Sequence, residues 1–178
     1  MIGLHIYLYI MIAVFALIGM SRGWAKELLV TFSVILMLFI ITVLERFVPF
    51  MRDNPEAFEG KTFFTIRALL LVVLAFFGYQ SPNLPRLAAS NRFARDRLQD
   101  WLLGFFLGAV NGYLIVGTLW FYLDKAGYPF DQIIDPSGTV YADEAARLIA
   151  SLPPQWLGQP AIFFAVAIAF AFVLVVFV

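Results

Sequence analysis

Five long apolar stretches, separated by polar and charged segments, dominate the sequence. They cover residues 2–20, 28–44, 63–79, 101–123 and 161–178. An α-helix needs about 20 apolar residues to cross the roughly 30 Å hydrocarbon core of a bilayer. The pattern therefore predicts an all-α, polytopic integral membrane bundle with about five transmembrane helices. The first stretch is longer than the roughly 7–15 apolar residues of a cleavable signal, so we expect it to be retained.

Composition supports a membrane location and excludes several kinds of site. Hydrophobic residues make up 62% of the 178 residues and charged residues 13%, whereas soluble domains carry about 25% charge. The formal net charge is zero, which argues against a nucleic-acid partner, because such proteins need a basic face. The chain has no cysteine and a single histidine, His5. We therefore expect no disulfide, no metal site and no cofactor.

The charges in the connecting segments predict an orientation. Segments 21–27 and 80–100 carry six Lys or Arg residues together, against five in segments 45–62 and 124–160, which also carry nine acids. Basic residues in short loops favour the cytoplasmic side. We expect a multi-pass protein of the bacterial inner membrane with its N-terminus outside and its C-terminus in the cytoplasm.

Two connecting segments have helical character of their own. In the extracytoplasmic loop 124–160, an amphipathic helix is predicted at about 142–152, lying on the outer membrane surface or capping the bundle. Segment 86–100 is either a basic helix on the lipid headgroups or a solvated cytoplasmic linker. On the first interpretation, lipid phosphate contacts its arginines, Arg92, Arg95 and Arg97.

Glycines recur at intervals of four residues in two of the apolar stretches. Gly104, Gly108 and Gly112 share one face of the fourth stretch, and Gly19 and Gly23 form a second pair at the end of the first. Small residues at this spacing allow two helices to approach closely. The pattern fits packing within the chain, and it also fits a homo-oligomer or an interface with another membrane subunit.

Two polar residues lie inside the apolar stretches. Arg67 is only four residues into the third stretch, so its side chain can extend to the outer interface and meet Glu59 or another outer acid. Asn111 lies in the middle of the fourth stretch, where we interpret it as a hydrogen-bonding residue between helices.

Catalytic pairings are scarce. Ser21 lies in a Gly-Met-Ser sequence, but His5 is 16 residues earlier on the same predicted helix, which is about 24 Å along the axis. A Ser21–Lys26 pair is permitted by spacing but has no other support. We therefore expect a protein that is not an enzyme.

Two motifs at the right separation carry a family resemblance. The turn IGMSRGWAKEL at residues 18–28, and Asp96-Arg97-Leu98 followed by the glycines of the fourth stretch, resemble the colicin V production protein (CvpA) family of bacterial inner-membrane proteins. The likeness covers roughly residues 1–155. The chain departs from the family by its fifth stretch and by two additional residues, Gln99 and Asp100, before Trp101.

The resemblance implies a function without catalysis. It points to a role in colicin V production or secretion, or in envelope maintenance, with Arg22, Lys26 and Glu27 at a turn that contacts lipid phosphate or a partner. Two alternatives stay open: an accessory transmembrane subunit of a larger bioenergetic complex, and a component of a small-solute channel or transporter. The expected partners are membrane lipids, together with further copies of the chain or other membrane subunits.

Overall fold

The computed structural model describes residues 3–49, 60–80, 97–133 and 135–177, and within these ranges all regular structure is helical. The all-α class is therefore confirmed. The elements in chain order are α1 (Leu4–Arg22), α2 (Trp24–Phe47), α4 (Gly60–Tyr79), α6 (Arg97–Lys125), the 3₁₀ turn η2 (Pro136–Gly138), α7 (Ala142–Ser151), α8 (Pro153–Trp156) and α9 (Ala161–Phe177).

Within the described residues, four helices are long and apolar enough to span a membrane: α1, α2, α4 and the Leu98–Lys125 part of α6. The protein is therefore a polytopic helical membrane protein. Each helix begins and ends within about one turn of the predicted stretch. α9 is apolar but only 17 residues long, so a fifth span stays a prediction.

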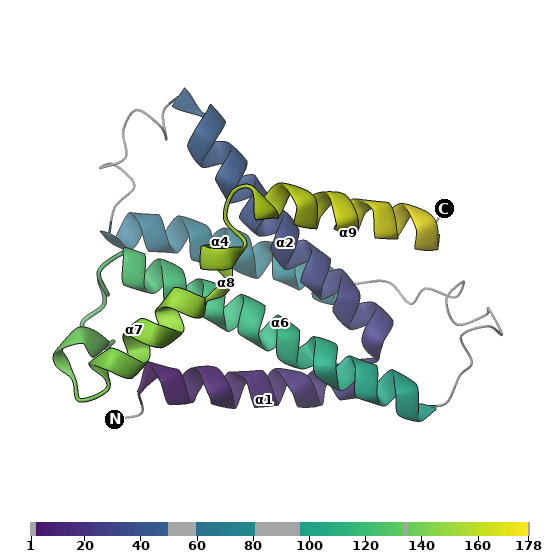
Figure 1. Cartoon of the computed structure of the whole chain (residues 1–178), viewed down its shortest axis with the longest axis horizontal. Coiled ribbons are helices and arrows are strands. Elements are labelled where there is room, and N and C mark those ends of the chain that lie inside the picture. Colours follow the sequence, from purple (N-terminus) through teal and green to yellow (C-terminus); the bar gives the residue numbers. More distant parts are fainter. Residues whose placement is uncertain (1–2, 50–59, 81–96, 134, 178) are drawn as a thin grey trace.

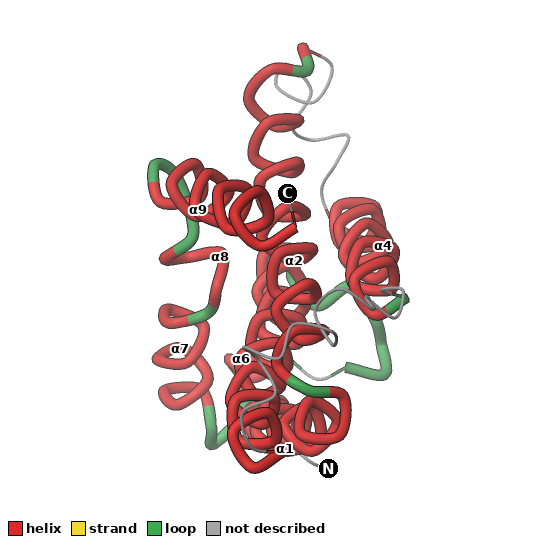
Figure 2. The backbone as a smooth tube through the Cα atoms, turned by 90° about the vertical axis from the view of Figure 1, so that its right-hand side faces the viewer, coloured by secondary structure: helices red, strands yellow, loops and turns green. Residues whose placement is uncertain are grey.

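The helices that follow one another in sequence are not those that pack most closely. Figure 1 shows α1 running along α6, while α2 crosses these helices obliquely and α9 crosses α2. In Figure 2, α4 lies on one side of α2 and α6, and α7 and α8 lie on the other. The turn at Gly23 is sharp, but α1 and α2 diverge from it instead of forming a closely packed hairpin.

Buried apolar side chains of α2 form the centre of the main core. Val30, Val34 and Met37 are fully buried, and Leu71 of α4 and Ile162 of α9 pack into the same cluster. Lipid tails are as apolar as these side chains, so their association within a membrane is stabilised mainly by close van der Waals packing.

The amphipathic helix caps the bundle. Ala145 of α7 and the adjoining Leu152 are buried against Leu8 of α1 and against Val116 and Trp120 of α6. In the structure α7 packs against α1 and α6, and its placement relative to the membrane surface stays a prediction.

A seam of small residues holds α1 against α6. A Cβ added at Gly108 would lie 2.9 Å from the Cα of Gly19, and one at Gly112 would lie 2.8 Å from the Cβ of Phe15. Gly104 likewise approaches Gly23, with 3.2 Å between an added Cβ and the Cα of that residue. The glycine faces on both helices therefore pack against each other within one chain, and they are not free for a second copy.

We predict that Gly108→Leu lowers the free energy of unfolding by about 1–3 kcal/mol, because the larger side chain forces the backbones of α1 and α6 apart. The matched control is Gly138→Leu, since an added Cβ at Gly138 meets nothing within 4 Å. Denaturation of both variants in a mild detergent measures the difference. Equal stability of the two variants would contradict the close seam.

Candidate functional site

A buried carboxylate near the start of α2 is the centre of the candidate site. Gly23 ends α1 and precedes α2 with φ 84°, a backbone conformation that favours glycine. One turn later, Glu27 is completely buried. An unpaired charge in that position would be very costly, so its partners determine what the site is.

Arg22 is the partner that carries the opposite charge. Its Nη1 donates to Glu27 Oε1 over 2.6 Å, and its Nη2 donates to the carbonyl oxygen of Tyr79 over 3.1 Å. The guanidinium also lies 4.2 Å from the centre of the Tyr79 ring, within the range of a cation–π interaction. The last residue of α1 therefore connects α2 to the end of α4.

Asn111 occupies the other side of the carboxylate. Its Nδ2 donates to Glu27 Oε2 over 2.8 Å and to the Glu27 carbonyl oxygen over 2.9 Å. The Thr31 hydroxyl lies 2.7 Å from Asn111 Oδ1 and can donate to it. Both amide hydrogens and the amide oxygen are thus used. We call Arg22, Glu27, Thr31, Tyr79 and Asn111 the polar junction, and it joins α1, α2, α4 and α6.

The chemistry of the polar junction is that of a compensated charge pair. The pair is formally neutral, and each charged group is hydrogen-bonded to a further group. Removing one partner of such a pair strands the other charge and typically costs about 3–5 kcal/mol. These bonds hold the helices in one arrangement and leave neither Glu27 oxygen without a donor.

Asp100 supports the same corner from the first turn of α6. Its Oδ1 accepts a hydrogen bond from the backbone N–H of Trp24 over 3.2 Å. This satisfies one of the backbone donors that the start of α2 leaves unpaired. A Cβ at Gly23 would lie 2.8 Å from Asp100 Oδ2, so the glycine also makes room for the carboxylate.

The structure separates residues that the sequence analysis had grouped together. Arg22, Lys26 and Glu27 were all expected at the lipid phosphate or a partner; instead, Arg22 and Glu27 bond to each other, and Glu27 has no exposed surface. In the described part of the chain, Lys26 takes no part in that pairing. Arg92 and Arg95 lie outside the described residues, as does the side chain of Arg97.

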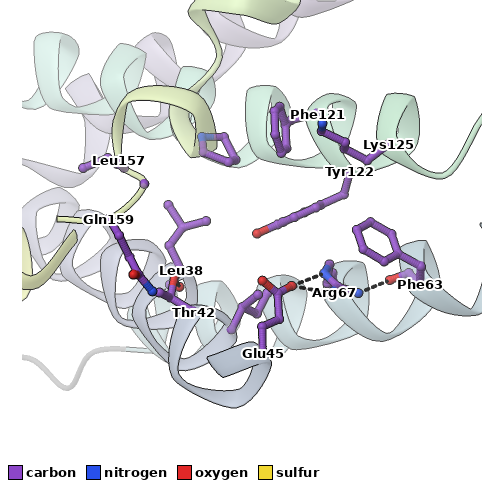
Figure 3. Close-up of a pocket in the computed structure, with 13 residues that line it drawn as sticks. Leu38, Thr42, Glu45, Phe63, Arg67, Phe121, Tyr122, Lys125, Leu157 and Gln159 are labelled. Atoms are coloured by element: carbon purple, nitrogen blue, oxygen red, sulfur yellow. Dashed lines mark hydrogen bonds and ion pairs between the residues drawn. The ribbon is translucent and has the colours of Figure 1, made fainter. Parts of the chain in front are cut away.

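Arg67 pairs with an acid at the opposite end of the bundle. Its Nε and Nη2 donate to Glu45 Oε1 and its Nη1 donates to the carbonyl oxygen of Phe63 (Figure 3). The guanidinium lies 3.5 Å from the centre of the Phe63 ring, and Arg67 as a whole is only 4% exposed. The partner is therefore a residue of α2, and Glu59, the first acid suggested by the sequence, lies outside the described residues.

Ser21 and His5, which were considered for catalysis, lie near opposite ends of α1. The Ser21 hydroxyl donates to the carbonyl oxygen of Ile18 over 2.7 Å. His5 is at the beginning of α1, where its Nε2 is 3.9 Å from Glu144 Oε2 and its ring contacts Tyr141. Within the described residues, no three His, Asp or Glu side chains gather as a possible metal site.

One titratable group beyond the end of α6 has a shifted pKa. Burial raises the pKa of the Tyr128 phenol above its ordinary value. Trp120 Nε1 donates to the phenol oxygen over 3.1 Å, and the phenol donates to Asp124 Oδ1 over 3.2 Å. Tyr128 therefore stays protonated and acts as a fixed hydrogen-bonding group.

Sequence reasoning did not identify four contacts that the structure uses. Thr31 lies one turn after Glu27 on α2, and that spacing was a usable signal. Glu45 was covered only by the expectation that Arg67 meets Glu59 or another outer acid, and Asp100 was noted only as an additional residue. The Tyr79 carbonyl had no signal at all, because a backbone acceptor at the end of a helix is available in any sequence.

One known protein family matches most of this chain. The family model described as colicin V production protein matches residues 4–141, well over half of the chain. The chain belongs to this family. Neither the curated proteins nor the solved structures gave a match. The protein is thus a CvpA-like integral membrane protein, and the resemblance noted in the sequence is confirmed.

The matched region contains all four long helices and every residue of the polar junction. It ends just before α7, somewhat earlier than the resemblance up to about residue 155 had indicated. The cap formed by α7 and α8, and the apolar helix α9, therefore lie beyond the part of the chain that matches the family.

We predict that Arg22→Leu destabilises the protein by about 3 kcal/mol or more, because it leaves Glu27 buried without a counter-charge. Arg22→Leu/Glu27→Gln should regain a large part of the loss. Lys26→Leu, a change of the same chemistry four residues away, should have little effect. Detergent denaturation of these variants and of Glu27→Gln alone measures the coupling between the two residues, and additive effects in the double variant would contradict it.

Proposed function

We propose that this CvpA-like protein acts in the bacterial inner membrane, without catalysing a reaction, in the production or export of colicin V or in envelope maintenance. Membership of the colicin V production protein family is the observation that carries this proposal. That family is not a known enzyme family. We expect membrane lipids, further copies of the chain or other membrane subunits to be its partners.

The pairing of the polar side chains inside the bundle supports this function. Glu27, Asn111 and Arg67 are the polar side chains that would suggest an ion or solute path through a membrane protein. Each is buried and bonded to another residue of the same chain. Because these groups are already paired, they favour a scaffold that offers its outer surface to partners. They argue against a channel lined by these residues.

The arrangement of the helices supports the proposed orientation. In Figure 1 the N-terminus, the end of α2 and the end of α6 lie at one end of the molecule, while the end of α1, the start of α6 and the C-terminus lie at the other. The segments that join helices at the second end, 21–27 (with Arg22 and Lys26) and 80–100, carry six Lys or Arg residues, against five in the segments 45–62 and 124–160 at the first end. We assign the second end to the cytoplasm, because basic residues favour that side.

Deletion of the gene in its bacterial host should reduce secreted colicin V activity or tolerance of envelope stress, and the wild-type gene should restore it. Ser21→Ala should restore it as well, because the proposed role needs no nucleophile, whereas Gly108→Leu should restore it poorly at equal expression. Unchanged secretion and stress tolerance after deletion would contradict the function. Failure of Ser21→Ala in a stably folded protein would contradict its non-catalytic character.

Reporter fusions test the orientation. Alkaline phosphatase, which is active only outside the cytoplasm, should be active when fused after Gly138 and inactive when fused at the C-terminus. Green fluorescent protein should give the reverse result. The opposite pattern would invert the proposed orientation and place the polar junction near the outer surface.

A further inference from the structure

A cavity of about 580 Å³ lies at the end of the bundle opposite the polar junction. Its walls come from α2, α4, α6 and the connection between α8 and α9 (Figure 3). The volume falls in the range of about 300–1,000 Å³ that is usual for sites that bind small molecules. Nothing in the proposed function accounts for a cavity there.

One part of the cavity lining is apolar. Leu38 and Ile41 of α2 and Leu157, which follows α8, contribute alkyl side chains. In Figure 3, Leu38 and Leu157 lie on the side away from Arg67, and the ring of Tyr122 points across the space between them. This part can accept a hydrocarbon chain.

The other part of the lining has an excess of positive charge. Arg67 and Lys125 are its two cations, and Glu45 is its one carboxylate. Glu45 is already paired with the buried Arg67. Lys125 is exposed; its ammonium lies 5.6 Å from the centre of the Phe121 ring, and no ion pair of Lys125 is found within the described residues. An anionic group entering here would meet a cation whose charge is uncompensated.

The walls are tied together in a way that keeps the cavity open. The Arg67–Glu45 pair connects α4 to α2, and Arg46 Nη1 donates to Gln159 Oε1 over 2.6 Å, which connects α2 to the segment before α9. Preorganised walls lower the entropy cost of binding.

We propose that this cavity binds an anionic amphiphile, with its phosphate or carboxylate head at Lys125 and Arg67 and its alkyl chain along Leu38, Ile41 and Leu157. The two parts of the lining match the two parts of such a molecule, and the bilayer around the helices is a source of it. A charge-assisted hydrogen bond from Lys125 is the main polar contact, because the Arg67 donors are largely used by Glu45 and Phe63.

Titration of the purified full-length protein in a neutral detergent tests the proposal. The probes are short-chain phosphatidic acid, short-chain phosphatidylcholine and inorganic phosphate, with the rise in denaturation temperature and native mass spectrometry as readouts. We expect phosphatidic acid to bind and stabilise, and the other two to do so at least about tenfold more weakly, which corresponds to one charge-assisted hydrogen bond.

Two lysines provide a matched pair of variants. Lys125→Gln removes the cation of the cavity and should weaken binding of phosphatidic acid about tenfold. Lys61→Gln removes an exposed lysine that also lies over a ring, that of Phe130 at 5.4 Å, but does not line the cavity; it should leave binding unchanged. Thr42→Phe keeps every charge, places a ring in the lining and should abolish binding.

Several results would overturn the proposal. Equal stabilisation by phosphatidylcholine, whose phosphate is neutralised by choline, would show that the net negative charge of the head group is not recognised. Equal stabilisation by inorganic phosphate would show that the apolar lining plays no part. Equal effects of Lys125→Gln and Lys61→Gln would assign the binding to the general protein surface. Since these are binding measurements, they can fail while colicin V production still depends on the protein, and the reverse also holds.

Discussion

The buried charge of Glu27 is the constraint on which the arrangement of the four long helices depends. A carboxylate without solvent requires a cation and hydrogen-bond donors, and here they come from different helices. Arg22 supplies the cation from α1, and Asn111 supplies the amide from α6. Arg22 in turn bonds to the carbonyl of Tyr79, which includes α4. Apolar packing tolerates small shifts between helices, whereas these bonds are satisfied in a single arrangement.

The glycine seam makes this arrangement possible. Asn111 lies between Gly108 and Gly112 on α6. The short distance from α1 to α6 at these glycines brings the end of α1 close to the place where Asn111 bonds to Glu27. The end of α1 is where Arg22 must be. A larger residue at Gly108 would therefore displace the cation as well as the backbone. The close approach and the charge pair support each other, which is how local preferences come to agree with a global fold.

The sequence predicted the helices well because their signal is local. A long apolar stretch and the glycines within or beside it can be recognised from one segment of the chain alone. The four long apolar helices lie where these stretches predict them. The bonds of Glu27 to Asn111 and of Arg67 to Glu45 could not be derived in the same way, because they join residues 84 and 22 positions apart in the chain. Arg22 is only five residues from Glu27, but spacing alone does not show that the two side chains are buried together. Adjacency in sequence does not decide packing either: α1 and α2 meet at Gly23, but Gly19 and Gly108 bring α1 against α6. The close contact between small residues prevailed, and α2 was left to cross the bundle.

The two ends of α4 show how one helix can serve two purposes. At its end, the Tyr79 carbonyl bonds to Arg22 in a compact region where each charge is compensated. Near its start, Arg67 bonds to Glu45 beside a cavity, and Lys125 lines the same cavity without an ion pair to any other described residue. Burial in the first region fixes the helix, and fixing the helix positions Arg67 in the second. A recognition surface in a small membrane protein needs such a rigid support, and the polar junction provides it from the far end of the same helix.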